Sequence, residues 1–352
     1  MQPAFRVIDS GVVEGRLNIA MGQALVESHQ AGEVPDTLRF LRFPPTALIG
    51  RHQALAQEIN LDYCRENQIG VARRITGGGA IFLDPGQLGW ELALKRSTLK
   101  SASLADLAQE ICEAVAAGIS SLGVQAHYRP RNDIEVEGRK ISGTGGFFDG
   151  DTLFYQGTVL VDMNPQLMVS ALRVPDAKLA RRHLDSAAQR VVTLRELLGE
   201  QTPGLPQIQE ALVTSFSHGF GLQMERGEWS GRERERAQQL WREEIGTDEF
   251  VGEIEEPPAA RGDLMGQQQC PGGHIKAYIR LEGPAQNRIR AALITGDFFV
   301  APPRIIYDLE ASLRGVYTDQ LAAAVRTFFE SADMGLLSVT ADDFIAAIQD
   351  AL

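Results

Sequence analysis

Apolar residues recur at helical spacing in two long stretches of the chain. Residues 13–30 and residues 104–122 each carry apolar side chains at every third or fourth position, which predicts two amphipathic helices. Ser103 is a favourable N-cap for the second helix, with Asp106 at the capping-box position, and Gly123 follows its last apolar residue. The apolar stripes consist of Leu17, Ala20, Met21, Ala24 and Leu25 in the first helix and of Leu104, Leu107, Ile111, Val115, Ile119 and Leu122 in the second.

Residues 88–95 show the clearest alternation of apolar and polar positions. They predict a strand whose apolar face, with Leu88, Trp90, Leu92 and Leu94, points into the core. The same reasoning predicts further strands at residues 37–43, 47–50 and 153–162, and further helices at residues 61–67, 206–220 and 232–245.

The pattern changes after residue 246, where an acidic stretch with proline and glycine runs to Asp263. We expect a domain boundary there, with a first domain of residues 1–246 and a second domain of residues 247–352. In the second domain the pattern predicts strands at residues 274–281 and 288–299 and helices at residues 306–314, 318–332 and 340–351. Two strands followed by helices predict a small α+β domain.

Composition and charge restrict the functional classes. The 352 residues are 44% hydrophobic and 23% charged, which is ordinary for a globular protein of two domains. A net charge of −12 argues against general binding to nucleic acid or to anionic membranes. The three cysteines, Cys64, Cys112 and Cys270, are odd in number and far apart, which fits a reducing compartment. Because no stretch has the apolar length of a signal peptide or of a membrane span, we expect a cytoplasmic protein.

Three consecutive glycines follow two arginines in RRITGGGAIFLD, residues 73–84. Glycine lets backbone N–H groups approach a ligand closely, and arginine supplies a fixed fork of donors, so this stretch can bind an anion. A flexible turn is an equally good interpretation of this stretch alone.

The second candidate stretch is RNDIEVEGRKISGTGG, residues 131–146. Ile134 and Val136 alternate with acidic residues, which predicts a half-buried strand, and Glu137 with Gly138 fits a hairpin turn. Lys140 then begins the return strand beside small residues and glycines. A lysine at such a position is ordinarily solvated, so this stretch alone does not establish a site.

Together, the two stretches closely resemble the lipoate–protein ligases of the lipoyl/biotin ligase superfamily. The likeness extends to GRHQ at residues 50–53, to YQGTVL at residues 155–160 and to RVVTLRELL at residues 190–198. By motif it covers residues 5–200, and the second domain resembles the accessory C-terminal domain of the larger lipoate ligases. The resemblance implies an α+β fold in which a mixed or antiparallel sheet carries flanking helices.

The resemblance also implies an activity: an ATP-dependent ligase that forms lipoyl-AMP from lipoate and ATP and transfers the lipoyl group to a lysine of a carrier domain. Lys140 would be the catalytic residue between the lipoate carboxyl group and the α-phosphate, and Mg²⁺ would neutralise phosphate charge through ligands that stay unassigned. Phe82, Trp90 and the strand of Ile134 are candidates for the acyl pocket. Contacts with ATP or adenylate are implied for Arg74, Thr76, Gly77, Gly78, Gly79, Ala80, Ile81, Phe82, Asn132, Asp133 and Lys140, and contacts with lipoate for Arg74, Gly79, Lys140, Gly143 and Thr144.

Other functions stay open. An octanoyltransferase of the same superfamily takes its acyl group from a carrier through a cysteine thioester. Its cysteine typically lies shortly upstream of the lysine, where residues 127–139 contain none. A biotin ligase would need a different arginine–glycine loop. A non-catalytic carrier-binding homologue would be consistent with Gly22 and Leu83, where relatives often have an acidic residue and a histidine, respectively.

Overall fold

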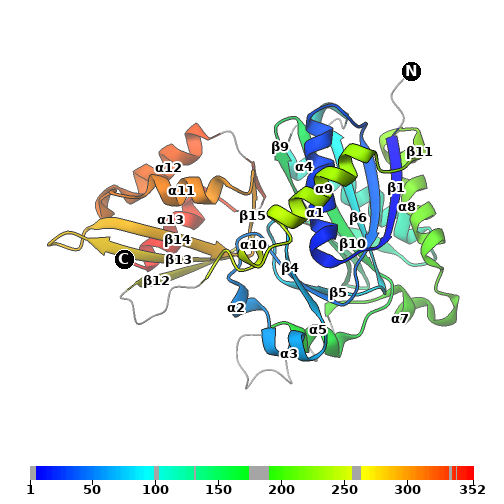
Figure 1. Cartoon of the computed structure of the whole chain (residues 1–352), viewed down its shortest axis with the longest axis horizontal. Coiled ribbons are helices and arrows are strands. Elements are labelled where there is room, and N and C mark those ends of the chain that lie inside the picture. The colour runs from blue at the N-terminus through cyan, green and yellow to red at the C-terminus, as the bar shows by residue number, and fades with distance from the viewer. Residues whose placement is uncertain are drawn as a thin grey trace.

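A mixed eight-stranded sheet forms the centre of the larger part of the molecule (Figure 1). The structure, a computed structural model, describes residues 5–98, 103–130, 132–173, 190–255, 263–332, 335–337 and 339–352. The strand order is β11-β1-β2-β6-β10-β9-β8-β7. The strands are β1 (Phe5–Val12), β2 (Thr37–Arg42), β6 (Gln87–Lys95), β7 (Ala126–Arg129), β8 (Asp133–Val136), β9 (Arg139–Asp149), β10 (Thr152–Leu160) and β11 (Met224–Arg226). β1 pairs in parallel with β2 and β11, and the pairs from β2 to β7 are antiparallel.

Four helices cover the two faces of this sheet. They are α1 (Gly15–Gln30), α4 (Leu104–Ser120), α8 (Leu205–Phe220) and α9 (Gly231–Glu243). α4 packs on α8, and their apolar residues join the sheet in one core. α1 packs on α9 at the opposite face, where Figure 1 shows both helices in front of the sheet. As predicted, Ser103 caps α4, with its Oγ accepting a hydrogen bond from the Asp106 N–H at 3.1 Å.

The two faces of strand β6 have different surroundings: one lies in the core and the other lies on the α1 side of the sheet. Its alternate apolar residues from Leu88 to Leu94 are fully buried in the core below α4, as the pattern predicted. Because successive side chains of a strand point to opposite faces, Gln87, Gly89 and Glu91 face the α1 side.

A smaller sheet of order β4-β3-β5 covers that side. Its strands are β3 (Thr46–Ile49), β4 (Gly70–Arg73) and β5 (Ile81–Leu83), and the short helices around it are α2 (Leu55–Glu58), α3 (Leu61–Glu66) and α5 (Pro165–Ala171). The glycine run connects β4 to β5. The fold therefore holds this loop over the face of the large sheet that carries Gln87, Gly89 and Glu91.

The carboxy-terminal part has a core of its own, whose buried residues all lie between Cys270 and Ala351. β12 (Leu264–Cys270), β13 (Gly273–Glu282) and β14 (Arg288–Gly296) form an antiparallel sheet, and β15 (Phe299–Ala301) pairs with β16 (Gly335–Leu337). The helices of this part are α11 (Ile305–Ser312), α12 (Leu321–Ser331) and α13 (Ala341–Asp350).

Two further short helices precede this part: α7 (Leu194–Leu198) and α10 (Asp248–Val251). Because α10 packs against β4, residues 248–251 lie on the first core, and the boundary near residue 246 stays a prediction.

The predicted fold class is confirmed, with a large mixed sheet, flanking helices and a small α+β unit. The pattern missed several elements, among them β1, α5 and β12; β12 reads LMGQQQC and has no apolar alternation. The predicted strand at residues 288–299 is two strands, because Gly296, with φ at 155°, turns the chain between β14 and β15. Among the described helices, none has the length and apolar character that a bilayer crossing requires.

Candidate active site

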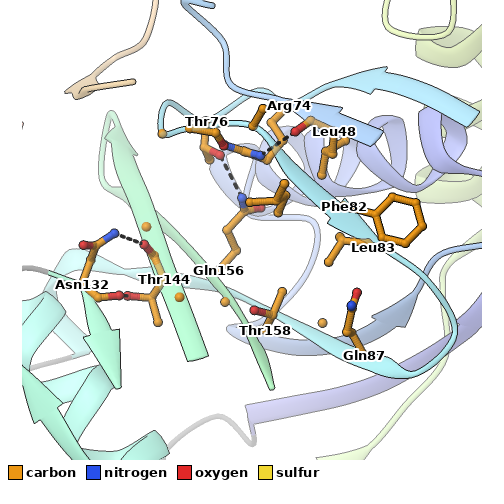
Figure 2. A pocket seen from close by; sticks show the side chains of 18 of the residues that line it. Leu48, Arg74, Thr76, Phe82, Leu83, Gln87, Asn132, Thr144, Gln156 and Thr158 are labelled. Atoms are coloured by element: carbon orange, nitrogen blue, oxygen red, sulfur yellow. Dashed lines mark hydrogen bonds between the residues drawn. The ribbon is translucent and has the colours of Figure 1, made fainter. Parts of the chain in front are cut away.

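One cavity of about 460 Å³ lies between the large and the small sheet. Its walls include the glycine loop, residues 74–80, and the β8–β9 hairpin that carries Lys140. Figure 2 shows Arg74 and Thr76 on one wall and Asn132 and Thr144 on another. Every residue predicted to contact nucleotide or lipoate lines this cavity: Arg74, Thr76, Gly77, Gly78, Gly79, Ala80, Ile81, Phe82, Asn132, Asp133, Lys140, Gly143 and Thr144. The two stretches thus meet at one site, and the individual roles of these residues stay predictions.

Lys140 is the second residue after a two-residue turn, on strand β9. Glu137 and Gly138 have φ angles of 53° and 73°, as a type I′ hairpin turn requires. The ammonium Nζ lies 2.7 Å from Asp133 Oδ1 on the paired strand. The side chain extends over Gly143, where a Cβ atom would come within 2.6 Å of Nζ. Since the Lys140 side chain is still 38% exposed, its charge can also meet an anion in the cavity.

Arg74 determines the shape of the glycine loop. Its buried guanidinium donates to the carbonyl oxygens of Leu48 at 3.2 Å, Gly77 at 3.1 Å and Gly79 at 2.8 Å. Burial lowers the pKa of Arg74 to about 10, so the group stays charged at neutral pH. Arg74 therefore fixes the loop through its carbonyl groups, and a direct contact with adenylate stays a prediction.

The carboxy-terminal unit closes one side of the cavity, which the sequence did not predict. Residues 271–273, Asp297 and Phe299 line it. The Phe299 ring lies against two glycines, because a Cβ atom on either Gly78 or Gly145 would overlap the ring. No local pattern indicates this contact, since it joins strand β15 to a loop more than two hundred residues earlier.

The carboxy-terminal unit also accepts a hydrogen bond from one of the N–H groups that were predicted to bind phosphate. The Gly78 N–H donates to the Phe298 carbonyl oxygen at 3.3 Å.

The Phe298 ring stacks on His52, with ring centroids 5.1 Å apart and an interplanar angle of 14°. Burial, with smaller effects from the charges of Arg51 and Arg73, lowers the pKa of His52 to about 3. His52 is therefore neutral, and its ring nitrogens have no hydrogen-bond partner among the described residues.

Polar side chains of β6 and β10 form the floor of the cavity. Gln156 Nε2 donates to Thr76 Oγ1 at 2.8 Å and so joins the floor to the glycine loop (Figure 2). Thr158 and Gln87 also line the cavity, on the other side of Gln156 from Thr144 in Figure 2. The alternation along these strands predicted their apolar faces, and the same alternation places these polar side chains on the opposite face.

The family model of the lipoyl protein ligase A/B catalytic domain matches residues 14–217, which is more than half of the chain. The chain belongs to this family. Octanoyltransferase LipM of Kyrpidia tusciae is 27% identical over 260 residues, which cover 67% of this chain and 94% of that protein. Lipoate-protein ligase LplJ of Bacillus subtilis is 32% identical over 193 residues, which cover 55% of this chain and 56% of that protein.

A solved structure extends the likeness to both parts of the fold. P. falciparum LipL1 in complex with lipoate has a TM-score of 0.70 and 15% sequence identity, and covers 94% of this chain and 95% of that one. The chain is therefore an enzyme of the lipoate ligase and octanoyltransferase family, and its carboxy-terminal unit is part of the shared fold.

The positions of the cysteines bear on the two activities of this family, because acyl transfer through a thioester needs a thiol at the acyl carbon. All three cysteines of the chain are described, and none lines the cavity. Cys112 lies behind the cavity wall, with its Sγ 3.3 Å from Thr144 Oγ1 and 3.7 Å from the Tyr155 hydroxyl. Burial raises the pKa of Cys112, and it also raises the pKa values of Cys64 and Cys270. A buried thiol with a raised pKa is a poor nucleophile in this conformation.

The three candidates for the acyl pocket differ in their position relative to the cavity, and their contact with an acyl chain stays a prediction. Phe82 and Trp90 line the cavity, although their exposed fractions are only 3% and 0%. The strand of Ile134 lines the cavity through Asp133, whereas the Ile134 side chain points to the opposite face of β8 and lies in the core below α4. Much of the apolar wall comes from residues that the prediction did not include, namely Ile19, Leu41, Phe43, Leu48 and Leu83.

Gly22, one of the departures from relatives, lies beside a buried ion pair. Glu91 Oε2 accepts a hydrogen bond from Arg39 Nη1 at 2.8 Å, and Arg39 also donates to Asn18. A Cβ atom on Gly22 would lie 3.2 Å from Glu91 Oε1. The Glu91 carboxylate therefore occupies the space into which an acidic side chain at position 22 would project.

Proposed function

We propose that this enzyme is an ATP-dependent lipoate–protein ligase. One observation carries the proposal: a single cavity holds the Lys140 ammonium and the glycine loop, and no thiol of the chain lines it. Formation of an acyl-adenylate joins two anions and therefore needs positive charge between them. Acyl transfer through a thioester needs a sulfur atom at the acyl carbon instead.

In the first half-reaction, a carboxylate oxygen of lipoate attacks the α-phosphorus of ATP, and the bond to pyrophosphate breaks. The Lys140 ammonium, positioned by Asp133, stabilises the negative charge shared by the carboxyl group and the α-phosphate. The loop that Arg74 holds in shape supplies backbone N–H groups to the phosphate. Mg²⁺ would neutralise the polyphosphate and be held mainly by phosphate oxygens, because no group of three or more metal-binding side chains converges within the described ranges.

In the second half-reaction, the amine of a lysine on a carrier domain attacks the carbonyl carbon of lipoyl-AMP. The bond between that carbon and the phosphate oxygen breaks, AMP leaves, and the amine releases a proton. Because the attacking amine must be neutral, a base has to accept its proton. The partner is thus a carrier protein that presents an accessible lysine.

Octanoyl transfer is the second candidate, and two observations favour it. The likeness to octanoyltransferase LipM spans 94% of that protein, and Cys112 lies in direct contact with the cavity residue Thr144. For Cys112 to act, its thiol would have to leave Thr144 and Tyr155 and reach the cavity.

The two candidate functions differ in the acyl donor: free lipoate with ATP for the ligase, and an octanoyl acyl-carrier protein for the transferase. The purified protein is incubated with a lipoyl carrier domain and either ATP, Mg²⁺ and lipoate or an octanoyl acyl-carrier protein without ATP, and the intact mass of the carrier domain is measured. The ligase proposal predicts a lipoyl mass increment with the first set alone. An octanoyl increment without ATP, abolished by Cys112→Ala, would overturn it in favour of transfer.

A further inference from the structure

Arg129 lies outside the cavity and binds two carboxylates beside Lys140. It is the last residue of β7, the strand at one edge of the large sheet. Its Nη2 donates to Asp133 Oδ2, and its Nη1 lies 2.6 Å from Glu135 Oε1. Both carboxylates are largely buried, with exposed side-chain fractions of 14% and 11%. Because Arg129 itself does not line the cavity, it can act on a bound substrate only through these partners.

The same two carboxylates belong to the surroundings of Lys140. The Lys140 Nζ lies 2.7 Å from Asp133 Oδ1, and Glu135 is the residue of β8 that pairs with Lys140 across the hairpin. The contact with Asp133 is ionic, since Oδ1 has no hydrogen-bond partner among the described residues. Lys140, Arg129, Asp133 and Glu135 therefore form a network of two positive and two negative groups, which we call the hairpin charge network.

The balance of this network decides how much of the Lys140 charge an anionic substrate can meet. Without Arg129, two carboxylates would face a single ammonium group. Burial of both carboxylates limits the screening of their charge by solvent. The excess negative charge would repel anions in the cavity and would hold the ammonium group more strongly at Asp133.

We propose that Arg129 is a positioning residue for Lys140: it neutralises Asp133 and Glu135, so that the Lys140 ammonium stays available to the carboxyl group of lipoate and the α-phosphate of ATP. The inference rests on the proposed ligase function and adds to it a residue that touches neither substrate. The competing explanation is structural, in that Arg129 only ties β7 to β8. Both explanations predict damage when Arg129 is removed, but they differ in what repairs it.

The first measurement is kcat/KM for ATP in lipoate-dependent release of pyrophosphate, with the Tm measured on the same preparations. Arg129→Gln removes the positive charge and should lower kcat/KM about tenfold. Arg129→Lys keeps the charge with a different donor geometry and should retain most of the wild-type value.

A second variant separates charge from structure. Glu135→Gln added to Arg129→Gln leaves one carboxylate opposite one ammonium group, so the double variant should regain most of the lost kcat/KM. A structural role predicts no recovery, because the second change removes a further ion-pairing group from the same strands. The difference between the wild-type chain and Arg129→Gln should also narrow as the ionic strength rises, since salt screens the unbalanced charge.

Arg139→Gln is the matched control, because it removes the same formal charge from the same hairpin. The partner that it leaves, Glu196, is 54% exposed, so solvent screens its charge, whereas Glu135 is largely buried. The control should therefore keep the wild-type kcat/KM. An equal loss in Arg139→Gln and Arg129→Gln would mean that only the overall charge of the hairpin matters, and the specific role of Arg129 would fail.

Three further outcomes overturn the assignment. If Arg129→Gln keeps the kcat/KM of a wild-type chain that releases pyrophosphate, only the role of Arg129 fails. If the double variant is as slow as Arg129→Gln, or if Arg129→Lys is as slow, Arg129 has a structural role. If the wild-type chain releases no pyrophosphate with lipoate, the proposed function and the role of Arg129 fail together.

Discussion

Replacing Lys140 by alanine should separate the catalytic from the structural effect of its charge. Because its side chain is 38% exposed and solvent screens the ion pair with Asp133, the pair contributes at most about 1 kcal/mol to the free energy of unfolding. Asp133 also keeps its second ion pair, with Arg129. Removing one preorganised donor from a charge-stabilising site raises the barrier by about 2.7–4 kcal/mol, which slows the reaction by about 10²–10³-fold. We therefore expect a folded variant whose Tm falls little and whose pyrophosphate release is almost lost.

The assay is lipoate-dependent release of pyrophosphate from ATP, with the Tm measured on the same preparations. Arg139→Ala is the matched control, because Arg139 precedes Lys140, pairs with Glu196 and does not line the cavity; it should keep the wild-type rate. Lys140→Arg keeps the positive charge but places it on a planar guanidinium, so it should retain only part of the wild-type rate. Wild-type release by Lys140→Ala would refute the role of this lysine in the first half-reaction.

Three further predictions concern the cavity walls and the contact between the two units. Cys112→Ala should keep ATP-dependent lipoylation and lower the Tm slightly, because it leaves a small void in the core; loss of all acyl transfer in a folded variant would contradict this. Gly145→Ala forces a Cβ atom into the Phe299 ring, so it should lower the Tm, and combination with Phe299→Ala should cost less than the sum of the two single changes in thermal melts; a strictly additive result would contradict the contact. His52 has a folded-state pKa of about 3 against an ordinary value of 6.5, so the unfolded chain binds more protons between these values and stability is lost as the pH falls from 6.5 toward 3. His52→Phe keeps the stack on Phe298 and should flatten that dependence in melts from pH 7 to pH 4; an unchanged slope would contradict it.

The parts of the site that the sequence predicted are those that a short stretch of chain determines by itself. The hairpin of Lys140 follows from Glu137 and Gly138, whose positive φ angles set the turn without help from distant residues. The meeting of the two stretches in one cavity came from the family resemblance, since periodicity does not bring a loop at residue 77 to a strand at residue 140. The polar floor, with Gln87 and Gln156, was open to prediction from the faces of β6 and β10.

Other parts depend on how separate elements pack, and no local pattern encodes them. Phe299 reaches Gly78 only because the carboxy-terminal unit docks on the glycine loop. The environment of Cys112 is a second such part. Its 3.3 Å contact with Thr144 depends on the position of α4 on the sheet, and this contact makes Cys112 the residue that the transferase alternative needs.

The most direct test of the central claim is a single-turnover reaction without any carrier protein. The protein is mixed with ATP, Mg²⁺ and lipoate, and pyrophosphate and lipoyl-AMP are quantified together. The account predicts one equivalent of each per active site, dependent on lipoate and lost in Lys140→Ala. Absence of both products from a folded wild-type protein that transfers octanoyl groups without ATP would contradict it.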